Sequence, residues 1–543
     1  MSKVAHYLQE HLLGEVLTSP SVRRYFSTDG GVFALSPQII VYPRNTSDVR
    51  KVARFTWQLA ERGKLLPITA RGKGSDQAGA AIGSGVMLVF PAHMNKLLEL
   101  DTGKGIVRVH PGIVYQTLQN TLHTHGRFLP PYPSSIDFST LGGAVANNAS
   151  GEKTVKYGST KNFVRELDVV LANGELIHTL RLTKRELSKK KGLTTFEGEI
   201  YRQLDGLITD NWDLIQTFKI DVSKNSTGYN LIDVKRKDGS FDLTPLFVGS
   251  QGTLGVVTQI TLDTEAFNPN TSLMAAHFAD LGGITSAINQ IMPLKPSAIE
   301  MVDRHLLEFV HKHNPRQLKG LIEPPFPGFV LLIEFDDVND RKQKRSVKRT
   351  RKILEGLSKE FSLARDEHER EMLWKIRHSA AAIIWHVEGR KKALPIIEDG
   401  VVPRDKFEDY INGIYKIFEE HRLETAVWGH AGDSNLHMQP FLDLASIGDR
   451  QKIFKIMDDY YNLVISLGGS TAGEHNDGRL RAPYLIKLYG AEKYDLLKKT
   501  KQIFDPYGTM NPGVKIDVKR EDVAPLLRKE YSMEHLSDYM PRT

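Results

Sequence analysis

Apolar and polar positions in the first part of the chain repeat with helical and strand-like periods in turn. Residues 45–63 carry apolar side chains on one face of a predicted helix, which Thr46 or Ser47 can cap. The short apolar runs 65–69 and 85–90 predict two strands. Helix and strand are therefore mixed from the start of the chain.

This mixed pattern continues to about residue 265. Residues 113–126 predict a second helix, and a glycine ends it. Residues 164–180 predict a hairpin, because Asn173 and Gly174 join two strand-like runs. We therefore expect an α+β domain with many glycine-containing loops.

The pattern changes near residues 267–272. Beyond this point longer helical stretches alternate with strand candidates such as 329–335 and 425–430. After about residue 475 the chain is helical again, and a Pro/Gly-rich segment stops the last helix within 501–513. We place a boundary between 265 and 266 and expect the charged residues 516–543 to form a peripheral extension.

The 543 residues include no cysteine. This excludes disulfides, cysteine-ligated zinc, iron–sulfur clusters and thiolate catalysis. A metal must therefore be held by His, Asp or Glu, and electrons that leave the protein need another carrier. No apolar run approaches the ~20 residues that span a bilayer, and the N-terminus has no signal-peptide pattern, so we expect a cytoplasmic protein.

Part of the net charge of +7 is concentrated in residues 341–352, where eight of twelve side chains are basic. No aromatic residues are interleaved to stack on bases, so we expect no nucleic-acid partner. The run favours a solvated helix face. A weak contact with an anionic membrane surface is the alternative.

Three segments combine glycine with small and hydroxyl residues: 69–85, 132–162 and 248–262. Glycine lets backbone N–H groups approach an anion closely. The first segment is neither a P-loop nor a Rossmann fingerprint, because no GK[ST] opens a helix and the next element is strand-like. Three such loops in one domain predict a large polar ligand that lies along the backbone.

Two further segments carry metal-ligand chemistry. His430 and His437 flank a short turn within 428–438, and Glu474 precedes His475 within 473–478. A histidine pair alone is more often non-ligating. Two histidines and one carboxylate, however, leave coordination positions open, as a catalytic metal requires.

Ten motifs in order between Tyr25 and Gly513 resemble one flavoprotein class, the vanillyl-alcohol-oxidase/p-cresol-methylhydroxylase class of FAD proteins. Within it they resemble the branch of D-lactate, glycolate and D-2-hydroxyglutarate dehydrogenases. The motifs are PRNTSDV (43–49), RGKGS (71–75), PSS (133–135), LGGAVANNASG (141–151), YGST (157–160), GSQGTLG (249–255), EDGVVP (398–403), GHAGDSNLH (429–437), GEH (473–475) and FDPYGTMNPG (504–513). The resemblance implies a two-part FAD-binding domain and a ferredoxin-like α+β cap domain.

The resemblance also implies which residues hold FAD. Residues 71–79 would wrap the pyrophosphate, and Val257 would lie near the adenine end. We expect noncovalent FAD, because Ser75 stands at the end of the first loop and the chain has no cysteine; His110 is the only nearby candidate for a covalent link. The implied cofactor residues are Arg71, Gly72, Lys73, Gly74, Ser75, Gly79, Pro133, Ser134, Thr140, Gly142, Gly143, Asn147, Ala149, Ser150, Gly151, Gly252, Val257 and Asn511.

The resemblance assigns catalytic roles as well. His430, His437 and Glu474 would bind a divalent metal, with zinc first and manganese or iron open. His475 would accept the substrate hydroxyl proton. Further roles fall to Arg377 for the substrate carboxylate, with a surface salt bridge as its alternative, to Lys392 for a second carboxylate, and to Asn435 for orienting the substrate.

The chain departs from the family pattern after His475, where Asn476 and Asp477 replace the usual glycine-containing loop. Asp477 could lower substrate affinity, add a metal contact or cap a turn, and the sequence does not rank these. The electron acceptor is expected to be separate: a partner subunit, a quinone or an electron-transfer flavoprotein. The sequence is compatible with a homodimer.

These observations predict an FAD-dependent oxidation of a D-2-hydroxy acid to the 2-oxo acid, with hydride transfer to flavin N5. The FAD domain would comprise 1–265 together with 475–515, and the cap 266–474. An alkylglycerone-phosphate-synthase-like flavin transferase is one rival, although it has no evident need for the metal set. A non-catalytic FAD subunit is the other, although all three ligands are present.

Overall fold

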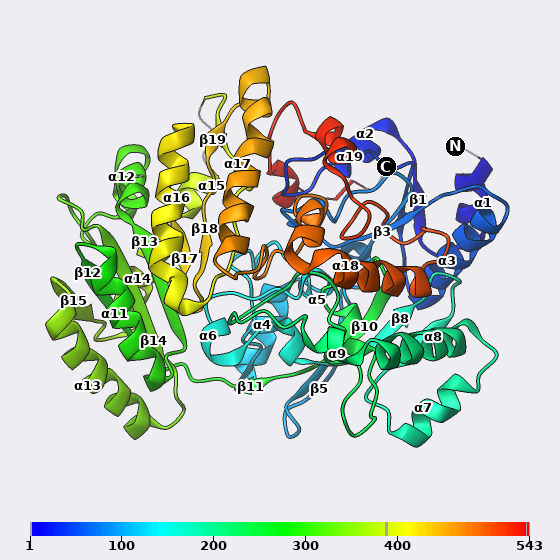
Figure 1. Cartoon of the computed structure of the whole chain (residues 1–543), viewed down its shortest axis with the longest axis horizontal. Coiled ribbons are helices and arrows are strands. Elements are labelled where there is room, and N and C mark those ends of the chain that lie inside the picture. The colour runs from blue at the N-terminus through cyan, green and yellow to red at the C-terminus, as the bar shows by residue number, and fades with distance from the viewer. Residues whose placement is uncertain (1–2, 386–388, 539, 542–543) are drawn as a thin grey trace.

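Three sheets of four or more strands form the framework of the computed structural model, which describes residues 3–385, 389–538 and 540–541. Figure 1 shows a six-stranded sheet with its helices on the left and the other two sheets below and to the right. The mixed helix-and-sheet fold agrees with the predicted α+β class.

The first sheet has the order β1-β2-β4-β3, with β2, β3 and β4 parallel and β1 antiparallel. Helix α3 (Thr46–Glu61) connects β2 to β3, as predicted, but its cap was wrong by one residue. Asn45 caps α3, because its side chain accepts the Asp48 N–H at 3.1 Å. The strands are β1 (Glu15–Leu17), β2 (Ile39–Tyr42), β3 (Ile68–Arg71) and β4 (Val86–Val89).

The second sheet is antiparallel, in the order β5-β6-β10-β8-β9. Strands β8 and β9 form the predicted hairpin, and Gly174 takes a φ of +86° in its turn. Helices α4 (Tyr115–Thr124), α5 (Leu141–Asn147) and α8 (Phe196–Asp210) share its apolar core. The strands are β5 (Leu97–Asp101), β6 (Ile106–Val109), β8 (Val164–Val170), β9 (Leu176–Thr179) and β10 (Val256–Asp263).

The third sheet lies within residues 272–437 and has the antiparallel order β15-β12-β14-β13-β17-β18. Strand β14 is buried at every position, because helices cover both faces of the sheet, and this explains why every residue of the strand except Glu334 is apolar. The strands are β12 (Ser272–Phe278), β13 (Ala298–Asp303), β14 (Phe329–Phe335), β15 (Glu360–Leu363), β17 (Trp428–His430) and β18 (Asn435–His437).

Two groups of helices enclose this sheet. One face packs on α11 (Leu281–Ile291), α13 (Asp340–Leu357), α16 (Phe407–His421) and α17 (Ile447–Ser466). The other packs on α12 (Arg304–His313), α14 (Glu367–His378) and α15 (Ala381–Ile384). The two-sided cover leaves the edge at β17 and β18 to face the rest of the molecule.

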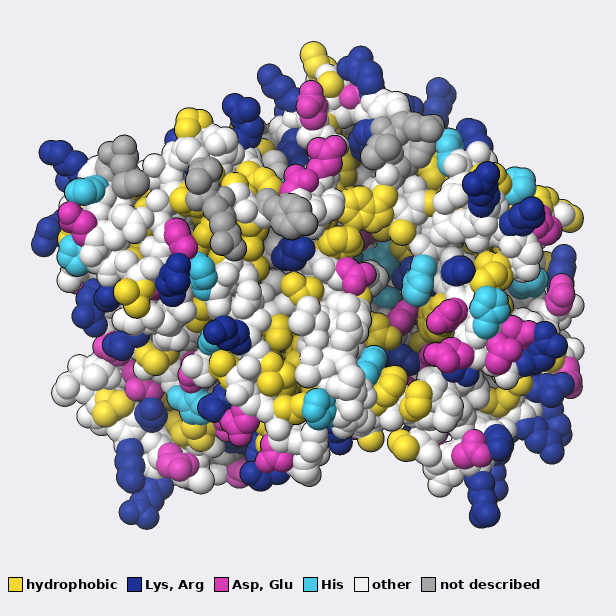
Figure 2. All heavy atoms as spheres, turned by 180° about the vertical axis from the view of Figure 1, so that it is seen from behind, with side chains coloured by type: hydrophobic (Ala, Val, Ile, Leu, Met, Phe, Trp, Pro, Cys, Tyr) yellow, Lys and Arg dark blue, Asp and Glu magenta, His cyan; other side chains and the backbone are white. Residues whose placement is uncertain are grey.

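The basic run forms the outer face of α13. All eight basic residues within 341–352 are exposed, while Val347 and Leu354 on the opposite face are buried. Figure 2 shows dark-blue side chains projecting at the lower right, where the reversed view places α13. No helix among the residues described is both long and apolar enough to cross a membrane.

The C-terminal residues return to the first two sheets. Helix α18 (Leu485–Phe504) contacts α8, and Met510 forms a parallel bridge with Ile68 of β3. The segment predicted as a peripheral extension also folds back, because Leu527 bridges Phe33 and Tyr42 donates its hydroxyl to the Pro541 carbonyl. Figure 1 shows both termini at the upper right, near α2 (Pro20–Tyr25) and α19 (Arg520–Val523).

Candidate active site

A short hairpin presents the two predicted ligand histidines. Strand β17 pairs antiparallel with β18, with His430 opposite Asn435 and Trp428 opposite His437. The turn between the strands is a 3-10 helix that ends at Ser434, which takes a left-handed φ of +54°. The two histidines flank a short turn, as predicted, and both imidazoles are buried at the edge of the sheet.

Glu474 brings a carboxylate to the histidine pair. Its Oε1 lies 3.1 Å from His430 Nε2 and 3.1 Å from His437 Nε2. The three ligand atoms lie within 4.8 Å of one another, and all three residues are buried. Two imidazole nitrogens and one carboxylate oxygen form the donor set of a catalytic divalent-metal site, so these residues fit such an ion. We call His430, His437, Glu474 and His475 the histidine cluster.

Residues 398–402 lie between the hairpin and the Glu474 segment. The Asp399 N–H donates to the Leu436 carbonyl at 3.1 Å, and the Gly473 N–H donates to the Asp399 carbonyl at 2.8 Å. The Asp399 carboxylate accepts the N–H of Glu474 at 3.0 Å and that of His475 at 2.7 Å. The backbone thus fixes Glu474 relative to both histidines.

Buried carboxylates also join the cluster to buried cations. Each of these carboxylates contacts an imidazole of the cluster. Each also contacts an Arg or Lys side chain that is itself buried. The contacts are His430 Nδ1–Glu300 Oε1 at 2.7 Å, Glu300 Oε2–Arg377 Nε at 2.6 Å, His475 Nδ1–Glu398 Oε1 at 2.7 Å, Glu398 Oε1–Arg481 Nη2 at 2.5 Å and Glu474 Oε2–Lys224 Nζ at 2.7 Å.

These partners keep the carboxylates ionised despite burial. Burial raises the pKa of Glu300, but His430 and Arg377 outweigh it and hold this pKa at about 2. Burial acts in the same direction on Glu474, yet Lys224 and His430 hold its pKa well below the usual range. Glu300 and Glu474 therefore keep their negative charge next to the position where a metal cation would bind.

Glu398 orients His475. Burial lowers the pKa of His475, but the Glu398 carboxylate outweighs that effect and raises this pKa to about 9. Because Glu398 engages Nδ1, the neutral imidazole keeps its proton there and leaves Nε2 as the base. The Nε2 atom lies 3.6 Å from Glu474 Oε1, next to the ligand atoms.

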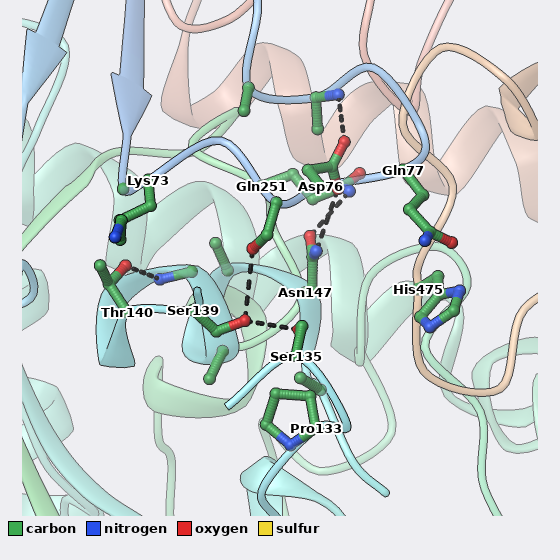
Figure 3. A pocket seen from close by; sticks show the side chains of 18 of the residues that line it. Lys73, Asp76, Gln77, Pro133, Ser135, Ser139, Thr140, Asn147, Gln251 and His475 are labelled. Atoms are coloured by element: carbon green, nitrogen blue, oxygen red, sulfur yellow. Dashed lines mark hydrogen bonds between the residues drawn. The ribbon is translucent and has the colours of Figure 1, made fainter. Parts of the chain in front are cut away.

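The cofactor loops and three residues of the histidine cluster line one cavity, while His430 lies outside its lining. Figure 3 shows Thr140, Ser139 and Asn147 on one side of it and His475 on the other. Fourteen of the predicted cofactor residues line the cavity: Arg71, Gly72, Lys73, Gly74, Ser75, Pro133, Ser134, Thr140, Gly142, Gly143, Asn147, Ala149, Gly252 and Val257. His437, Glu474, His475, Arg377 and Glu398 line it too.

Four predicted cofactor residues lie outside the cavity lining: Gly79, Ser150, Gly151 and Asn511. Ser150 donates its hydroxyl to Glu474 Oε2 at 2.9 Å, so it helps to position the Glu474 carboxylate. The Asn511 amide donates to the carbonyls of Ala80 and Gln251 at 2.9 and 2.8 Å and joins two loops. Ser150 and Asn511 thus position cavity residues without lining the cavity themselves.

The wall formed by the cofactor loops fits a dinucleotide. A Cβ at Gly72 would lie 2.3 Å from the Thr140 hydroxyl, so only glycine permits this close approach. Arg71 is buried, and neither its Nε nor its Nη2 has a hydrogen-bond partner among the residues described. Unpaired guanidinium N–H groups are costly to bury and suit an anionic ligand such as a pyrophosphate.

Two protein families match consecutive parts of the chain. The "FAD binding domain" matches residues 37–180, and "FAD linked oxidases, C-terminal domain" matches residues 268–514. The chain belongs to the FAD-linked oxidases. The first match contains two of the three glycine-rich segments, 69–85 and 132–162, and the second match covers the whole histidine cluster.

Curated relatives of this FAD-linked oxidase share less than a third of its residues. D-2-hydroxyglutarate dehydrogenase of Escherichia coli is 29% identical over 93% of the chain, and the glycolate oxidase subunit GlcD of Bacillus subtilis is 27% identical over 88%. The match covers 50% of the first relative and 88% of the second. The chain thus spans about half the length of the D-2-hydroxyglutarate dehydrogenases it matches.

Solved structures share the fold of this FAD-linked oxidase. 4-Ethylphenol oxidase from Gulosibacter chungangensis superposes with a TM-score of 0.67 at 15% identity, covering 96% of this chain and 99% of that one. An alkyldihydroxyacetonephosphate synthase superposes with a TM-score of 0.61 at 16% identity, covering 94% and 85%. At these identities the likeness concerns the fold alone.

The remaining predicted catalytic residues of this FAD-linked oxidase occupy different places. Arg377 lines the cavity, but its Nε is engaged by Glu300. The Asn435 amide donates to the carbonyls of Asp399 and Gly400 at 3.0 and 3.1 Å, and Asn435 lies outside the cavity lining. Lys392 lies in β16 (Lys392–Ala393), also outside that lining.

Asn476 and Asp477 are buried, and their side chains hold together segments that are far apart in the sequence. Asp477 accepts from Lys515 Nζ at 2.6 Å and from the Gly228 N–H at 2.8 Å, and both ends of the ion pair are fully buried. The Asn476 amide donates to the Asn147 and Gly249 carbonyls, each at 3.0 Å. In this structure Asp477 belongs neither to the group His430, His437 and Glu474 nor to the second group that could hold a metal, which is Glu398, His437 and His475.

Several site residues of this oxidase escaped sequence reasoning: Glu300, Glu398, Arg481, Lys224 and Gln439. Glu398 begins the EDGVVP motif, so its signal was present without a role. Gln439 lines the cavity two residues after His437, is buried, and has no hydrogen-bond partner for its Oε1 among the residues described. The sequence could have indicated Gln439, because residues two positions apart in an extended segment point to the same side and His437 was already a candidate.

Proposed function

We propose that this FAD-linked oxidase is a dehydrogenase that converts a D-2-hydroxy acid, such as D-lactate or D-2-hydroxyglutarate, to the 2-oxo acid. The observation that supports this is the shared cavity, lined at one side by the cofactor loops and at the other by His437, Glu474 and His475. The oxidation removes a hydride from C2 and a proton from the hydroxyl. The two sides of the cavity would serve these two needs.

In this proposal FAD would supply the hydride acceptor, and a divalent metal, with zinc first, would supply a Lewis acid that lowers the hydroxyl pKa. His430, His437 and Glu474 would hold the metal. His475 would accept the hydroxyl proton at Nε2, since Glu398 holds Nδ1 at 2.7 Å. Arg481 would keep Glu398 oriented for this role.

Arg377 would bind the substrate carboxylate. Its Nε is engaged by Glu300 at 2.6 Å, and its side chain lines the cavity. Because Glu300 also contacts His430 Nδ1, Arg377 would orient a metal ligand and the substrate together. Gln439 offers a buried, unpaired Oε1 to a hydrogen-bond donor of the substrate. Electrons would then pass to a separate acceptor.

The test is an anaerobic visible spectrum of the purified protein with D-lactate and then D-2-hydroxyglutarate. We expect the visible absorption band of oxidised flavin. One of the D-acids should bleach this band, and its L-isomer should not. Bleaching by both isomers, or by no 2-hydroxy acid in a panel of short-chain and dicarboxylic members, would overturn the proposal. Substrate chirality is the readout because the metal and Arg377 fix two groups on C2 relative to the flavin.

His437→Ala provides the matching site test. The variant should keep flavin absorbance, lose bound metal and lose bleaching by the active D-acid. His6→Ala is the control, because His6 is an exposed histidine on α1 (Lys3–His11), with its side chain 70% exposed. Normal bleaching by His437→Ala would remove this residue from the metal site.

A further inference from the structure

The C-terminal strap, residues 524–538, packs against the N-terminal residues 29–34. The Ala34 N–H donates to the Leu526 carbonyl at 2.8 Å, and the Arg528 N–H donates to the Val32 carbonyl at 3.0 Å. The strap thus extends residues 32–34 by backbone pairing. Figure 1 shows this red segment beside the blue N-terminal elements.

Residues 29–31 lie between the strap and the cofactor loop. Arg528 Nη2 donates to the Asp29 carbonyl at 2.6 Å, and the Tyr531 hydroxyl donates to the Gly30 carbonyl at 2.7 Å. On the other side, a Cβ at Gly31 would lie 2.7 Å from the Gln77 carbonyl oxygen. The strap, residues 29–31 and the cofactor loop are therefore in direct contact, and residues 29–31 have no room for added atoms.

His535 crosses the middle layer and contacts the cofactor loop itself. Its Nε2 lies 3.1 Å from the Gly74 carbonyl oxygen, which also accepts the Gly30 N–H at 3.0 Å. The Tyr25 hydroxyl donates to the His535 carbonyl at 3.0 Å and fixes the residue in turn. Gly74 lines the cofactor cavity and takes a φ of +82°.

The loop from Gly72 to Ser75 needs such external support. Glycine loses more conformational freedom on ordering than any other residue, so a loop with two glycines in four positions is costly to fix. Within the loop, the Gly74 carbonyl is turned away from the cavity toward two donors, one from each end of the chain. Both donors hold the loop in the conformation that lines the cavity.

We propose that the C-terminal strap is part of the cofactor site, with His535 and Arg528 as positioning residues for FAD. Neither residue lines the cavity, so each acts through the loop: His535 on Gly74 and Arg528 on residues 29–31. Retention of FAD therefore depends on side chains more than 450 positions beyond the loop in the sequence. The inference rests on FAD binding and does not depend on the substrate or the metal.

The experiment compares His535→Ala, His535→Gln and Glu530→Ala in the full-length protein. Glu530 is an exposed residue of the same strap and serves as the matched control. FAD is removed from each variant, and its dissociation constant is then measured by quenching of flavin fluorescence. The melting temperature of each FAD-free protein is recorded alongside.

We expect His535→Ala to bind FAD about tenfold more weakly, as expected for loss of one buried hydrogen bond. His535→Gln, which restores an N–H donor, should return the dissociation constant to within about threefold of the unaltered protein. Glu530→Ala should match the unaltered protein. Arg528→Gln should weaken FAD binding further, since it loses contacts with two carbonyls.

Two results would overturn the proposal. One is an unchanged FAD dissociation constant in His535→Ala. The other is equal weakening in His535→Ala and His535→Gln together with an equal fall in the melting temperature of both FAD-free proteins, which would make His535 a residue of general stability only. Because FAD is titrated without substrate, either outcome is independent of whether a hydroxy acid is oxidised.

Discussion

The two sides of the cavity are built on opposite principles. The cofactor wall (the lining residues within 70–77, 133–149 and 250–257) consists largely of glycines, small side chains and hydroxyls close together in sequence. The histidine cluster depends on charged side chains paired across 77 positions in Glu300–Arg377 and 130 positions in Glu300–His430. The cofactor wall should therefore lose FAD when atoms are added to it. The histidine cluster should lose its function when one of its charges is removed.

The largest effect is expected from adding atoms to the wall. In Gly72→Val the new Cβ would lie 2.3 Å from the Thr140 hydroxyl, so the loop must move and FAD should be lost, together with all turnover. The ratio of flavin to protein absorbance measures this. Gly206→Ala is the control, because a Cβ there meets nothing within 4 Å. If the Gly72→Val protein keeps its flavin absorbance, the loop can move enough to accept the larger side chain, and the prediction is wrong.

Removing a charge from the cluster should leave the flavin in place. Glu474→Gln keeps the side-chain shape but loses the anionic ligand, so we expect loss of divalent metal and a fall in turnover of about 10³-fold, corresponding to roughly 4 kcal/mol. Metal content by mass spectrometry and flavin absorbance are measured together. Glu371→Gln, on the exposed face of α14, is the control. Retained metal in Glu474→Gln would contradict the ligand assignment.

A smaller effect is expected at Glu398, which acts on His475 without being one of the three proposed ligands. Glu398→Gln should cut turnover about 10- to 100-fold with metal retained. It also leaves the fully buried Arg481 unpaired, which costs roughly 3–5 kcal/mol of stability.

The double variant Glu398→Gln/Arg481→Met separates these two consequences. It removes the unpaired cation, so the melting temperature should recover while turnover stays low. Recovery of both quantities would mean that Glu398 serves stability and has no part in orienting His475. Failure of both to recover would show that Arg481 has a further role in packing.

The smallest effect concerns pH and the C-terminal strap. Burial lowers the pKa of His535 to about 4, with the cations Arg71 and Arg528 adding to this and the Gly74 carbonyl opposing it. Folding thus favours the neutral imidazole, and the unfolded chain binds more protons below about pH 6.5. Stability from this residue is present above pH 6.5 and is lost as the pH falls toward 4.

The measurement is the melting temperature of the unaltered protein minus that of His535→Gln, between pH 7.5 and 4.5. We expect this difference to shrink as the pH falls, because glutamine does not titrate. A difference that stays constant over this range would mean that His535 is protonated in neither state or equally in both.

The contrast also explains what the sequence could predict. Helix α3, the β8–β9 hairpin and the cofactor loops depend on neighbours in sequence, so local patterns sufficed. The roles of Glu300 and Lys224 depend on partners 130 and 250 positions away and leave no local pattern. Asn435 was predicted to orient substrate, but the structure uses its amide to hold residues 399–400.

The strap illustrates a further limit. Residues 516–543 are rich in charge, which predicts an exposed tail. Arg528 and His535 are nevertheless buried, because the carbonyls of residues 29–31 and 74 face them. A charged side chain in a short segment does not reveal whether a distant backbone oxygen will satisfy it.

Residues 398–402 set the distance between the hairpin that carries His430 and His437 and the segment that carries Glu474. Asp399 bonds to Leu436 on one side and to Gly473 on the other, and Val401 bridges both Asn435 and Ser470. The lengths of the connections through α16 and α17 therefore do not affect the spacing of His430, His437 and Glu474. A circular permutant opened between α16 and β17 should keep its ligand geometry, whereas a one-residue insertion at Gly400 would turn Glu398 and Asp399 to the wrong faces.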